Sequence, residues 1–297
     1  MTIEEILSDS INKLMQNNKK SPHLEAEILL SHIIKKPREY ILAHSEKLLT
    51  KPQHTHYTKC ISRRLKGEPI AYIMGQKQFY GYDFIVNKNV LIPRPETELM
   101  VDEALNLITH NSQPITLIDV GTGSGCIIIS LLKKSKAQNL KSKIQFYAID
   151  ISKPALSIAY KNARLHKVSN KIKIFHGNLL VPVMKNSLFT IHRSQFIILA
   201  NLPYLTPKQT KQSPTIKFEP KLALSAGKDG LKYFRILFKQ IKIMQKIFSA
   251  SGYVLCEIDP SQKPKIIKLI KNILPKAIIK IKKDLKGHDR LINLIVN

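Results

Sequence analysis

From about residue 115 onward, short apolar runs alternate with stretches of helical periodicity, and no other feature of the sequence constrains the fold as strongly. The apolar runs predict buried strands, and the stretches between them predict helices. Repeated strand–helix units form a parallel sheet whose two faces are covered by helices. The expected strands cover residues 116–120, 143–149, 173–175 and 195–200, and the expected helices cover residues 126–132 and 154–165.

The last part of the chain departs from this alternation. Three further strands are expected at residues 253–258, 277–281 and 291–296, and too few residues separate the last two strands for a helix between them. Strands joined by a short connection pair antiparallel. A parallel sheet that ends in an antiparallel hairpin indicates the α/β class, a doubly wound, Rossmann-like sheet in the variant that methyltransferases use.

The first part of the chain has a different, purely helical pattern. Apolar residues recur three or four positions apart, which predicts amphipathic helices. Thr2 and Glu5 have the spacing of a capping box, and Pro22 indicates the start of a second helix. A further apolar stripe ends before Gly67. We therefore expect a small helical domain over residues 1–75.

Between these two regions, aromatic and β-branched residues dominate, with Asn87 and Asn89 as candidate turn formers. This composition predicts a β-hairpin or an extended connector. Pro93 and Pro95, one residue apart, keep the following stretch extended. The expected organisation is a helical domain at 1–75, the connector at 76–95 and the sheet domain at 96–297.

The chain of 297 residues carries 48 Lys and Arg residues against 21 Asp and Glu residues, a formal net charge of +27. A strongly basic protein suggests an anionic partner such as nucleic acid. However, only eight of the 48 are Arg, the residue that bidentate recognition of phosphates and bases favours. Because the lysines are also scattered, we interpret them as a solvated surface and expect no stable nucleic-acid partner; a nucleic-acid footprint is the alternative.

Composition also excludes several other classes of protein. A hydrophobic fraction of 43% excludes disordered and collagen-like chains. No uncharged apolar run approaches the ~20 residues of a membrane span, and the acidic N-terminus predicts no secretory signal. Cys60, Cys126 and Cys256 have the spacing of neither a disulfide framework nor a zinc site. We expect a cytoplasmic monomer with no membrane partner and no metal.

A glycine-rich turn follows the first of the parallel strands. Glycines let the backbone turn tightly and approach a ligand closely. Cys126 occupies the position at which the dinucleotide fingerprint needs its third glycine, so the turn does not call for a pyrophosphate. S-adenosylmethionine (SAM) has no phosphate and suits such a turn. The cofactor contacts predicted here are Gly121, Thr122, Gly123, Ser124 and Gly125.

Two carboxylates accompany this turn. Asp150 ends the second parallel strand, where a carboxylate can accept hydrogen bonds from both hydroxyl groups of a ribose. Asp119 precedes the turn, and it can alternatively be a structural carboxylate that ties the glycine loop down. Taken alone, the turn has the plainer interpretation of a tight strand-to-helix connection. Its combination with Asp150 and with the motif after the fourth strand favours a cofactor site.

The tetrapeptide Asn201-Leu202-Pro203-Tyr204 follows the fourth parallel strand, at the edge of the sheet where ligands bind in this fold. It resembles the Asn-Pro-Pro-Tyr motif of amino-group methyltransferases. An amide nitrogen is a poor nucleophile because its lone pair is delocalised. The Asn201 side-chain oxygen and a nearby main-chain carbonyl can accept its two hydrogens, and Tyr204 can stack on the planar group. Catalysis is then mainly positioning for in-line transfer.

Leu202 stands where that motif usually has its first proline. The carbonyl group of residue 202 remains, and Pro203 still favours an extended Leu202. Weaker preorganisation is expected, because one fixed φ angle is lost. In isolation, the tetrapeptide has the alternative interpretation of a simple strand-ending turn.

Several further stretches resemble the PrmC/HemK family, the glutamine methyltransferases of peptide-chain release factors. With the glycine turn and the tetrapeptide, the resemblance covers nearly the whole chain, and the N-terminal helices resemble the small helical domain of that family. The segments Ile-Pro-Arg-Pro-Glu-Thr and Phe-Glu-Pro distinguish this family from other amino-group methyltransferases. The stretches that carry the resemblance are residues 67–75, 92–98, 218–224, 227–231 and 284–290.

The resemblance implies a SAM-dependent enzyme that methylates the N5 nitrogen of the glutamine in the Gly-Gly-Gln motif of class 1 release factors, which would be its protein partners. It implies that the N-terminal helices help to recognise the substrate. Arg94 and Glu98 are expected to line or brace the site, or else to form an ion pair. The residues implied for the cofactor are the glycine turn, Asp150 and Asn201, and those implied for the glutamine are Asn201, Leu202, Pro203 and Tyr204.

Asn178 and Leu179 replace the acidic and aromatic residues that the family usually has near the adenine. Asn178 can still bond the adenine edge, and Leu179 can cover a ring face. Two alternative functions stay open. One is N-methylation of a DNA adenine or an RNA base, which uses the same tetrapeptide chemistry. The other is a non-catalytic SAM-binding protein, which the departures at these two residues and at Leu202 keep open.

Overall fold

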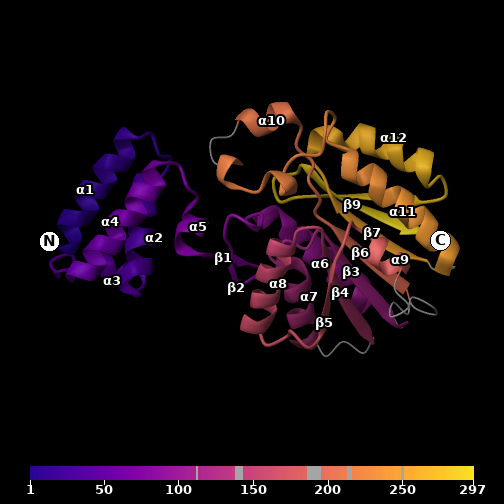
Figure 1. Cartoon of the computed structure of the whole chain (residues 1–297), viewed down its shortest axis with the longest axis horizontal. Coiled ribbons are helices and arrows are strands. Elements are labelled where there is room, and N and C mark those ends of the chain that lie inside the picture. Colours follow the sequence, from indigo (N-terminus) through magenta and orange to yellow (C-terminus); the bar gives the residue numbers. More distant parts are fainter. Residues whose placement is uncertain (112, 138–142, 186–194, 213–215, 249–250) are drawn as a thin grey trace. The chain divides into compact units, whose positions relative to one another are not determined.

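The computed structural model describes residues 1–111, 113–137, 143–185, 195–212, 216–248 and 251–297 (Figure 1). The chain divides into two compact units. The first unit comprises Met1–Gln76 and Pro214–Phe218, and the second comprises Lys77–Ser213 and Glu219–Asn297. Most of the stretch expected as a connector therefore belongs to the second unit.

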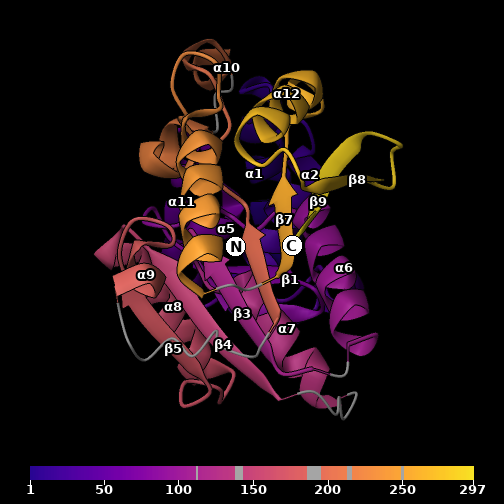
Figure 2. The same cartoon turned by 90° about the vertical axis from the view of Figure 1, so that its right-hand side faces the viewer.

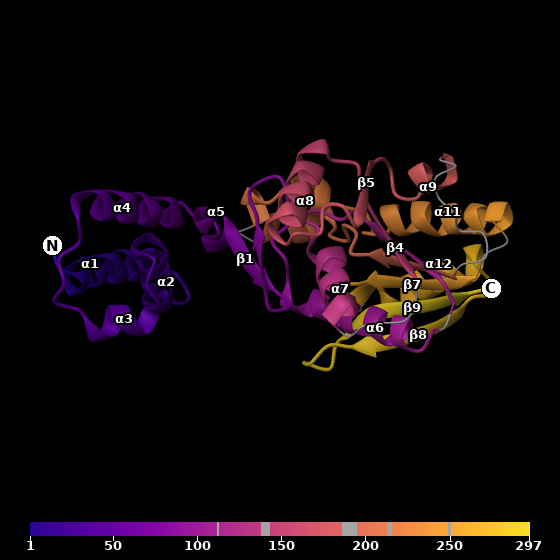
Figure 3. The same ribbon diagram turned by 90° about the horizontal axis from the view of Figure 1, so that it is seen from below.

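The first unit is helical, as its apolar periodicity predicts (Figure 3). The predicted capping box is confirmed: the Thr2 hydroxyl accepts the backbone N–H of Glu5, and the Glu5 carboxylate accepts that of Thr2, at 3.2 and 2.8 Å. The buried faces of the helices meet in one core that includes Leu14, Leu29 and Tyr57. The helices are α1 (Ile3–Gln16), α2 (Pro22–Ile34), α3 (Arg38–Ala43), α4 (Lys51–Leu65) and α5 (Ile70–Met74).

In the second unit, seven of the described strands form one sheet in the order β5-β4-β3-β6-β7-β9-β8. The first five strands of this order run parallel, and β9 pairs antiparallel with both β7 and β8. The predicted parallel sheet with a terminal antiparallel hairpin is thus confirmed (Figures 1 and 2). The strands are β3 (Ile115–Val120), β4 (Ile144–Asp150), β5 (Ile172–His176), β6 (Gln195–Ala200), β7 (Gly252–Glu257), β8 (Ile278–Lys283) and β9 (Asp289–Val296).

Helices cover both faces of this sheet (Figure 2). Because successive side chains of a strand point to opposite faces, Ile118 belongs to one buried core and Leu117 to the other. Residues of α9 (Val181–Lys185), α11 (Lys232–Phe248) and α12 (Lys263–Ile273) complete the first core. Residues of α6 (Glu98–Thr109), α7 (Cys126–Ala137) and α8 (Lys153–Leu165) complete the second. The shorter elements are α10 (Pro207–Gln212), η1 (Pro95–Thr97), η2 (Ile216–Phe218), η3 (Lys221–Ala223) and η4 (Pro260–Gln262).

The stretch before α6 contains the expected hairpin, formed by β1 (Gln76–Phe79) and β2 (Tyr82–Ile85). The turn lies at Tyr80 and Gly81, which both have positive φ angles, 52° and 76°. A two-residue turn with positive φ angles at both positions has a backbone twist that matches the right-handed twist of the two strands that it joins. The hairpin turn is therefore not at the two asparagines. Asn87 and Asn89 do form a turn, as predicted, but it follows β2: Asn87 Oδ1 accepts the backbone N–H of Asn89 at 3.0 Å, and the Asn87 carbonyl accepts that of Val90 at 3.1 Å.

No helix among the described residues is long and apolar enough to cross a membrane. The described residues likewise contain no group of three or more His, Cys, Asp or Glu side chains that could hold a metal ion.

Candidate active site

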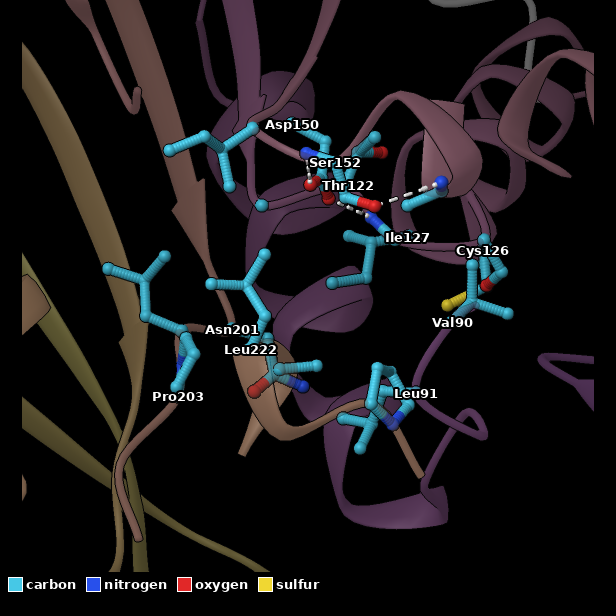
Figure 4. A pocket seen from close by; sticks show the side chains of 18 of the residues that line it. Val90, Leu91, Thr122, Cys126, Ile127, Asp150, Ser152, Asn201, Pro203 and Leu222 are labelled. Carbon is cyan, nitrogen blue, oxygen red and sulfur yellow. Dashed lines mark hydrogen bonds between the residues drawn. The ribbon is translucent and has the colours of Figure 1, made fainter. Parts of the chain in front are cut away.

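A pocket of the second unit lies at the carboxyl ends of the parallel strands (Figure 4). Ligands of open α/β sheets bind at this edge. Segments that end or follow β3, β4, β5 and β6 all contribute to its lining. Of the predicted site residues, Gly125 and Tyr204 lie outside the lining. The pocket brings together Gly121, Thr122, Gly123, Ser124, Asp150, Asn178, Leu179, Asn201, Leu202, Pro203 and Arg94.

The glycine turn has the left-handed backbone that its composition suggests. Gly121, Gly123 and Gly125 have φ angles of 74°, 56° and 78°, which side chains other than glycine rarely adopt. A Cβ atom on Gly125 would lie 3.1 Å from Ile129 Cδ1 and 3.4 Å from Ala159 Cβ. Gly125 therefore allows the turn to pack closely against α7 and α8.

Asp119 is buried beneath this turn and does not line the pocket. Its Oδ2 atom accepts a hydrogen bond from the Thr122 hydroxyl at 2.6 Å. Its Oδ1 atom has no hydrogen-bond partner among the described residues. Burial, with a smaller contribution from the nearby Asp150 charge, raises the pKa of Asp119 to about 7. The geometry supports the structural interpretation of Asp119, as the group that ties the turn down.

Asp150 lines the pocket at the end of β4. Its Oδ2 atom accepts the backbone N–H of Gly123 at 2.9 Å, and its Oδ1 atom accepts that of Ser152 at 2.8 Å. A carboxylate offers about four acceptor positions, so two remain for the hydroxyl groups of a ligand. Burial raises the pKa of Asp150, and these backbone N–H groups oppose that effect. The predicted ribose contact is compatible with this arrangement.

The segment after β5 forms another wall of the pocket. Leu179 has a φ angle of 52°, an uncommon backbone conformation for a bulky side chain. Gln240 of α11 holds the segment, because its Oε1 atom accepts the backbone N–H of Leu180 at 2.8 Å. A Cβ atom on Gly177 would lie 2.3 Å from Pro182 Cγ, so only glycine fits there. Long-range contacts thus place Asn178 and Leu179.

Asn201 is connected to two buried side chains from distant parts of the chain. Its Nδ2 atom donates to the Thr97 hydroxyl oxygen at 3.0 Å. The Thr97 hydroxyl in turn donates to Glu257 Oε2 at 2.6 Å. Thr97 and Glu257 are 2% and 3% exposed, so neither group has water as a substitute partner. Burial raises the pKa of Glu257, while the Thr97 hydroxyl and the Arg290 charge lower it.

The rest of the tetrapeptide divides between the pocket and the core. Leu202 is buried against the glycine turn, since a Cβ atom on Gly121 would lie 3.3 Å from Leu202 Cδ2. Pro203 lines the pocket, whereas the Tyr204 ring packs against the core of the sheet. Burial and the Glu257 charge raise the pKa of Tyr204, so its phenol is protonated at neutral pH. Gln262 Nε2 donates to the Tyr204 carbonyl at 2.8 Å.

Arg94 reaches the pocket but does not pair with Glu98. Its Nη2 atom donates to Glu219 Oε1 at 2.5 Å, and the other oxygen of Glu219 accepts the backbone N–H of Ile92 at 3.2 Å. Glu98 instead accepts the backbone N–H of Tyr80 at 2.7 Å and braces the hairpin. The alternative of an Arg94–Glu98 ion pair is therefore wrong.

The chemistry of the lining fits SAM. Among the described residues, Arg94 is the one cationic side chain of this lining, and it is already paired with Glu219. The described part of the lining thus offers a phosphate group no unpaired cation. A positively charged sulfonium group and a ribose instead suit a lining with the Asp150 carboxylate and the apolar side chains of Ile127 and Ile151.

Several supporting residues escape prediction from sequence. Thr97 lies within a recognisable motif, yet nothing in the motif reveals its partners. Asn162 of α8 is fully buried; its Nδ2 atom donates to the Ser124 carbonyl at 2.8 Å, and its Oδ1 atom accepts the N–H of Ile85 at 2.7 Å. Glu257 has no motif at all. The contacts that identify these residues form only in the folded chain.

Models of two protein families match the chain. The model of the PrmC N-terminal domain matches residues 5–75, and the model of the ribosomal protein L11 methyltransferase (PrmA) matches residues 95–202. Among solved structures, the hMettl16 catalytic domain in complex with MAT2A 3'UTR hairpin 1 covers 90% of either chain at 13% identity, with a TM-score of 0.56. At that identity the likeness shows the fold alone.

Relatives with two different names are similar over nearly the whole chain. A "Bifunctional methyltransferase" of Rickettsia prowazekii is 35% identical over 312 residues, 99% of this chain but 57% of the relative. The chain thus spans little more than half the length of the bifunctional relatives. The "Release factor glutamine methyltransferase" of Dictyoglomus turgidum is 36% identical over 299 residues, 99% of this chain and 98% of the relative. The chain therefore belongs to the PrmC/HemK family of release factor glutamine methyltransferases.

Proposed function

We propose that this protein transfers a methyl group from SAM to the side-chain amide nitrogen, N5, of the glutamine in the Gly-Gly-Gln motif of class 1 release factors. The observation that carries this proposal is the pocket itself. It joins the glycine turn and Asp150 to the segment from Asn201 to Pro203, in a chain whose relatives over full length include glutamine methyltransferases.

The side chains of the pocket have the chemistry that amide methylation needs. When bound, SAM supplies an electrophilic methyl group on a positively charged sulfur. The Asn201 Oδ1 atom and the Leu202 carbonyl would accept the two N–H hydrogens of the glutamine amide and orient its nitrogen. This step is positioning, worth up to about 7–11 kcal/mol in well-oriented systems. No strong base is required before attack, because the proton leaves afterwards.

The cofactor would be held by the glycine turn and Asp150. The two remaining acceptor positions of Asp150 suit the ribose hydroxyls. Asn178 and Leu179 line the same pocket and would contact the adenine. Leu202 retains its carbonyl, so the departure from the usual proline does not remove an acceptor. The Tyr204 ring would support the segment from the core.

The helices of residues 1–75 would contribute to recognition of the release factor as a folded protein. We infer that the protein acts as a monomer in the cytoplasm, where release factors work. The match of residues 5–75 to the PrmC N-terminal domain supports this division of labour.

Mass spectrometry of a release factor incubated with SAM and this protein tests the proposal. We expect a mass gain of one methyl group on the Gly-Gly-Gln peptide, and we expect Asn201→Ala to abolish it. Parallel reactions with duplex DNA and with ribosomal RNA test the nucleic-acid alternative, which the charge of +27 would favour. An unmodified release factor beside a methylated nucleic acid would refute the proposal; binding of SAM with no methylation of either would leave a non-catalytic protein.

A further inference from the structure

At the wall of the pocket, three polar side chains from three separate elements are connected in series. Asn201 follows β6, Thr97 ends η1 and Glu257 ends β7. The hydrogen bonds run from Asn201 Nδ2 to Thr97 Oγ1, 3.0 Å, and from Thr97 Oγ1 to Glu257 Oε2, 2.6 Å. Asn201 and Thr97 line the pocket, and Glu257 is buried at the far end of the series.

The hydrogen bond to Glu257 sets the direction of this series. The Thr97 hydroxyl donates to Glu257 Oε2. A hydroxyl group has one proton, so the proton of Thr97 is committed to Glu257. The Thr97 oxygen is then an acceptor toward Asn201, and only the NH2 end of the Asn201 amide can donate to it. As a result, the Oδ1 end of that amide faces away from Thr97.

This orientation matters because an amide group has two ends of similar shape and opposite hydrogen-bonding character. With Oδ1 presented to the substrate, Asn201 accepts an N–H of the glutamine amide. With the NH2 end presented, two donors would face each other and the contact would be lost. Nothing about Asn201 alone selects between these two arrangements.

We propose that Thr97 and Glu257 are positioning residues for the transfer: Glu257 fixes the direction of the hydrogen bonds from Asn201 through Thr97, and thereby holds the Asn201 amide with Oδ1 toward the substrate nitrogen. This inference rests on the proposed function. It assigns a role to one residue of the Ile-Pro-Arg-Pro-Glu-Thr segment and to a strand-ending glutamate that carries no motif.

The variant Thr97→Val tests the role of the hydroxyl, because valine has nearly the shape of threonine and cannot hydrogen-bond. We expect kcat to fall by about tenfold to 100-fold, with the SAM dissociation constant within about twofold of that of the wild type. Thr97→Ser restores the hydroxyl and should recover most of the loss. Glu257→Gln should also lower kcat, because a neutral amide can present either end to Thr97 and no longer sets a direction.

Thr109→Val is the matched control. The Thr109 hydroxyl donates to the Leu105 carbonyl at 2.8 Å on α6, away from the pocket lining. We expect unchanged kcat for this variant. Thermal unfolding of each variant separates a loss of positioning from a loss of folded protein. A folded Thr97→Val enzyme with the kcat of the wild type would overturn the proposal, as would a variant whose stability falls while its kcat does not.

A second measurement does not depend on turnover. In protein labelled with 15N-asparagine, the Asn201 side-chain NH2 signal can be assigned by its absence in Asn201→Ala. We expect slow solvent exchange of this group in the wild type and in Thr97→Ser, and exchange faster by about tenfold in Thr97→Val. Equal exchange in wild type and Thr97→Val would refute the connection. If exchange behaves as expected and no release factor is methylated, the proposed function fails while the connection stands.

Discussion

At the scale of single residues, the pocket depends on groups whose surroundings fix their protonation and backbone geometry. Asp119 is a buried carboxyl group with one hydrogen-bonded oxygen and one oxygen that has no partner among the described residues. Gly177 is a position that no side chain fits. Both residues act on the pocket indirectly. Asp119 holds the glycine turn in place, and Gly177 allows the segment with Asn178 and Leu179 to pack closely.

Asp119→Asn should change how stability depends on pH. The pKa of Asp119 in the folded protein is about 7, above its ordinary value of 3.8, so the folded state binds the proton more tightly than the unfolded state. The stabilisation from this group is therefore fully present below pH 3.8, is lost as pH rises to about 7, and changes little above that pH. Asparagine does not titrate. The free energy of unfolding of the variant, relative to that of the wild type, should therefore rise by roughly 1–4 kcal/mol from pH 4 to pH 8. Urea unfolding at several pH values measures this; a difference that stays constant with pH would contradict it.

Gly177→Ala should weaken both stability and SAM binding. The added Cβ atom would lie 2.3 Å from Pro182 Cγ and must displace the segment with Asn178 and Leu179. Overpacking of this kind costs about 1–3 kcal/mol. Gly287→Ala is the control, because its Cβ atom would meet nothing within 4 Å and only its positive φ angle of 80° is strained. Titration calorimetry should show weaker SAM binding for the first variant alone; equal affinities would argue against a link between this packing and the cofactor.

At the scale of elements, a helix on one face of the sheet holds a loop that lies at its edge. α11 contributes Gln240, which accepts the buried backbone N–H of Leu180. That hydrogen bond fixes a segment in which Leu179 has an uncommon φ angle. The geometry of the pocket thus depends on a helix that contributes no motif.

Gln240→Leu should destabilise the protein by about 1–3 kcal/mol, because it leaves the Leu180 N–H buried without an acceptor. It should also weaken SAM binding, since the segment after β5 is released. Gln245→Leu, on the same helix, is the matched control: its Nε2 atom donates to the Asn297 carbonyl at the exposed surface, 2.9 Å. Urea unfolding and SAM titration should distinguish the two variants. If both variants lose the same stability and affinity, the buried hydrogen bond has no special role.

At the scale of the whole molecule, the charge of +27 is compatible with a protein substrate. The chemistry of the pocket requires no nucleic acid, and the cationic side chain that lines it in the described part of the chain, Arg94, is paired. The remaining basic residues still produce a long-range field. Such a field accelerates encounter with an acidic partner and is screened by salt over about 8–10 Å at physiological ionic strength.

Salt should therefore slow methylation of an acidic, intact release factor more than methylation of a short uncharged peptide with the same glutamine. Between low and roughly 0.5 M salt we expect kcat/KM for the intact protein to fall by about tenfold, and kcat to change little. The peptide serves as the internal control, because it gains almost nothing from the field. An equal salt effect on both substrates would show that the charge does not steer the encounter.

The sequence by itself determines the local elements and the motifs that the pocket joins. The capping box at Thr2, the glycine turn and the strand before Asp150 are specified by preferences that act over a few residues. The same reasoning misplaces the hairpin turn, because the asparagines are ordinary turn formers and the positive φ angle of Tyr80 is imposed by the paired strands.

Only the tertiary structure decides which distant groups meet. Thr97 and Glu257 are 160 residues apart, and Thr97 and Asn201 are 104 apart, yet they form one series of hydrogen bonds. The tertiary structure likewise decides that β9 lies between β7 and β8 in the sheet. Such contacts result from the packing of the whole core. The hydrophobic effect that drives this packing is non-directional, so many pairings of strands and helices would bury the same apolar residues. The buried polar bonds then select one of these pairings, since leaving them unmade costs more than any local preference gains.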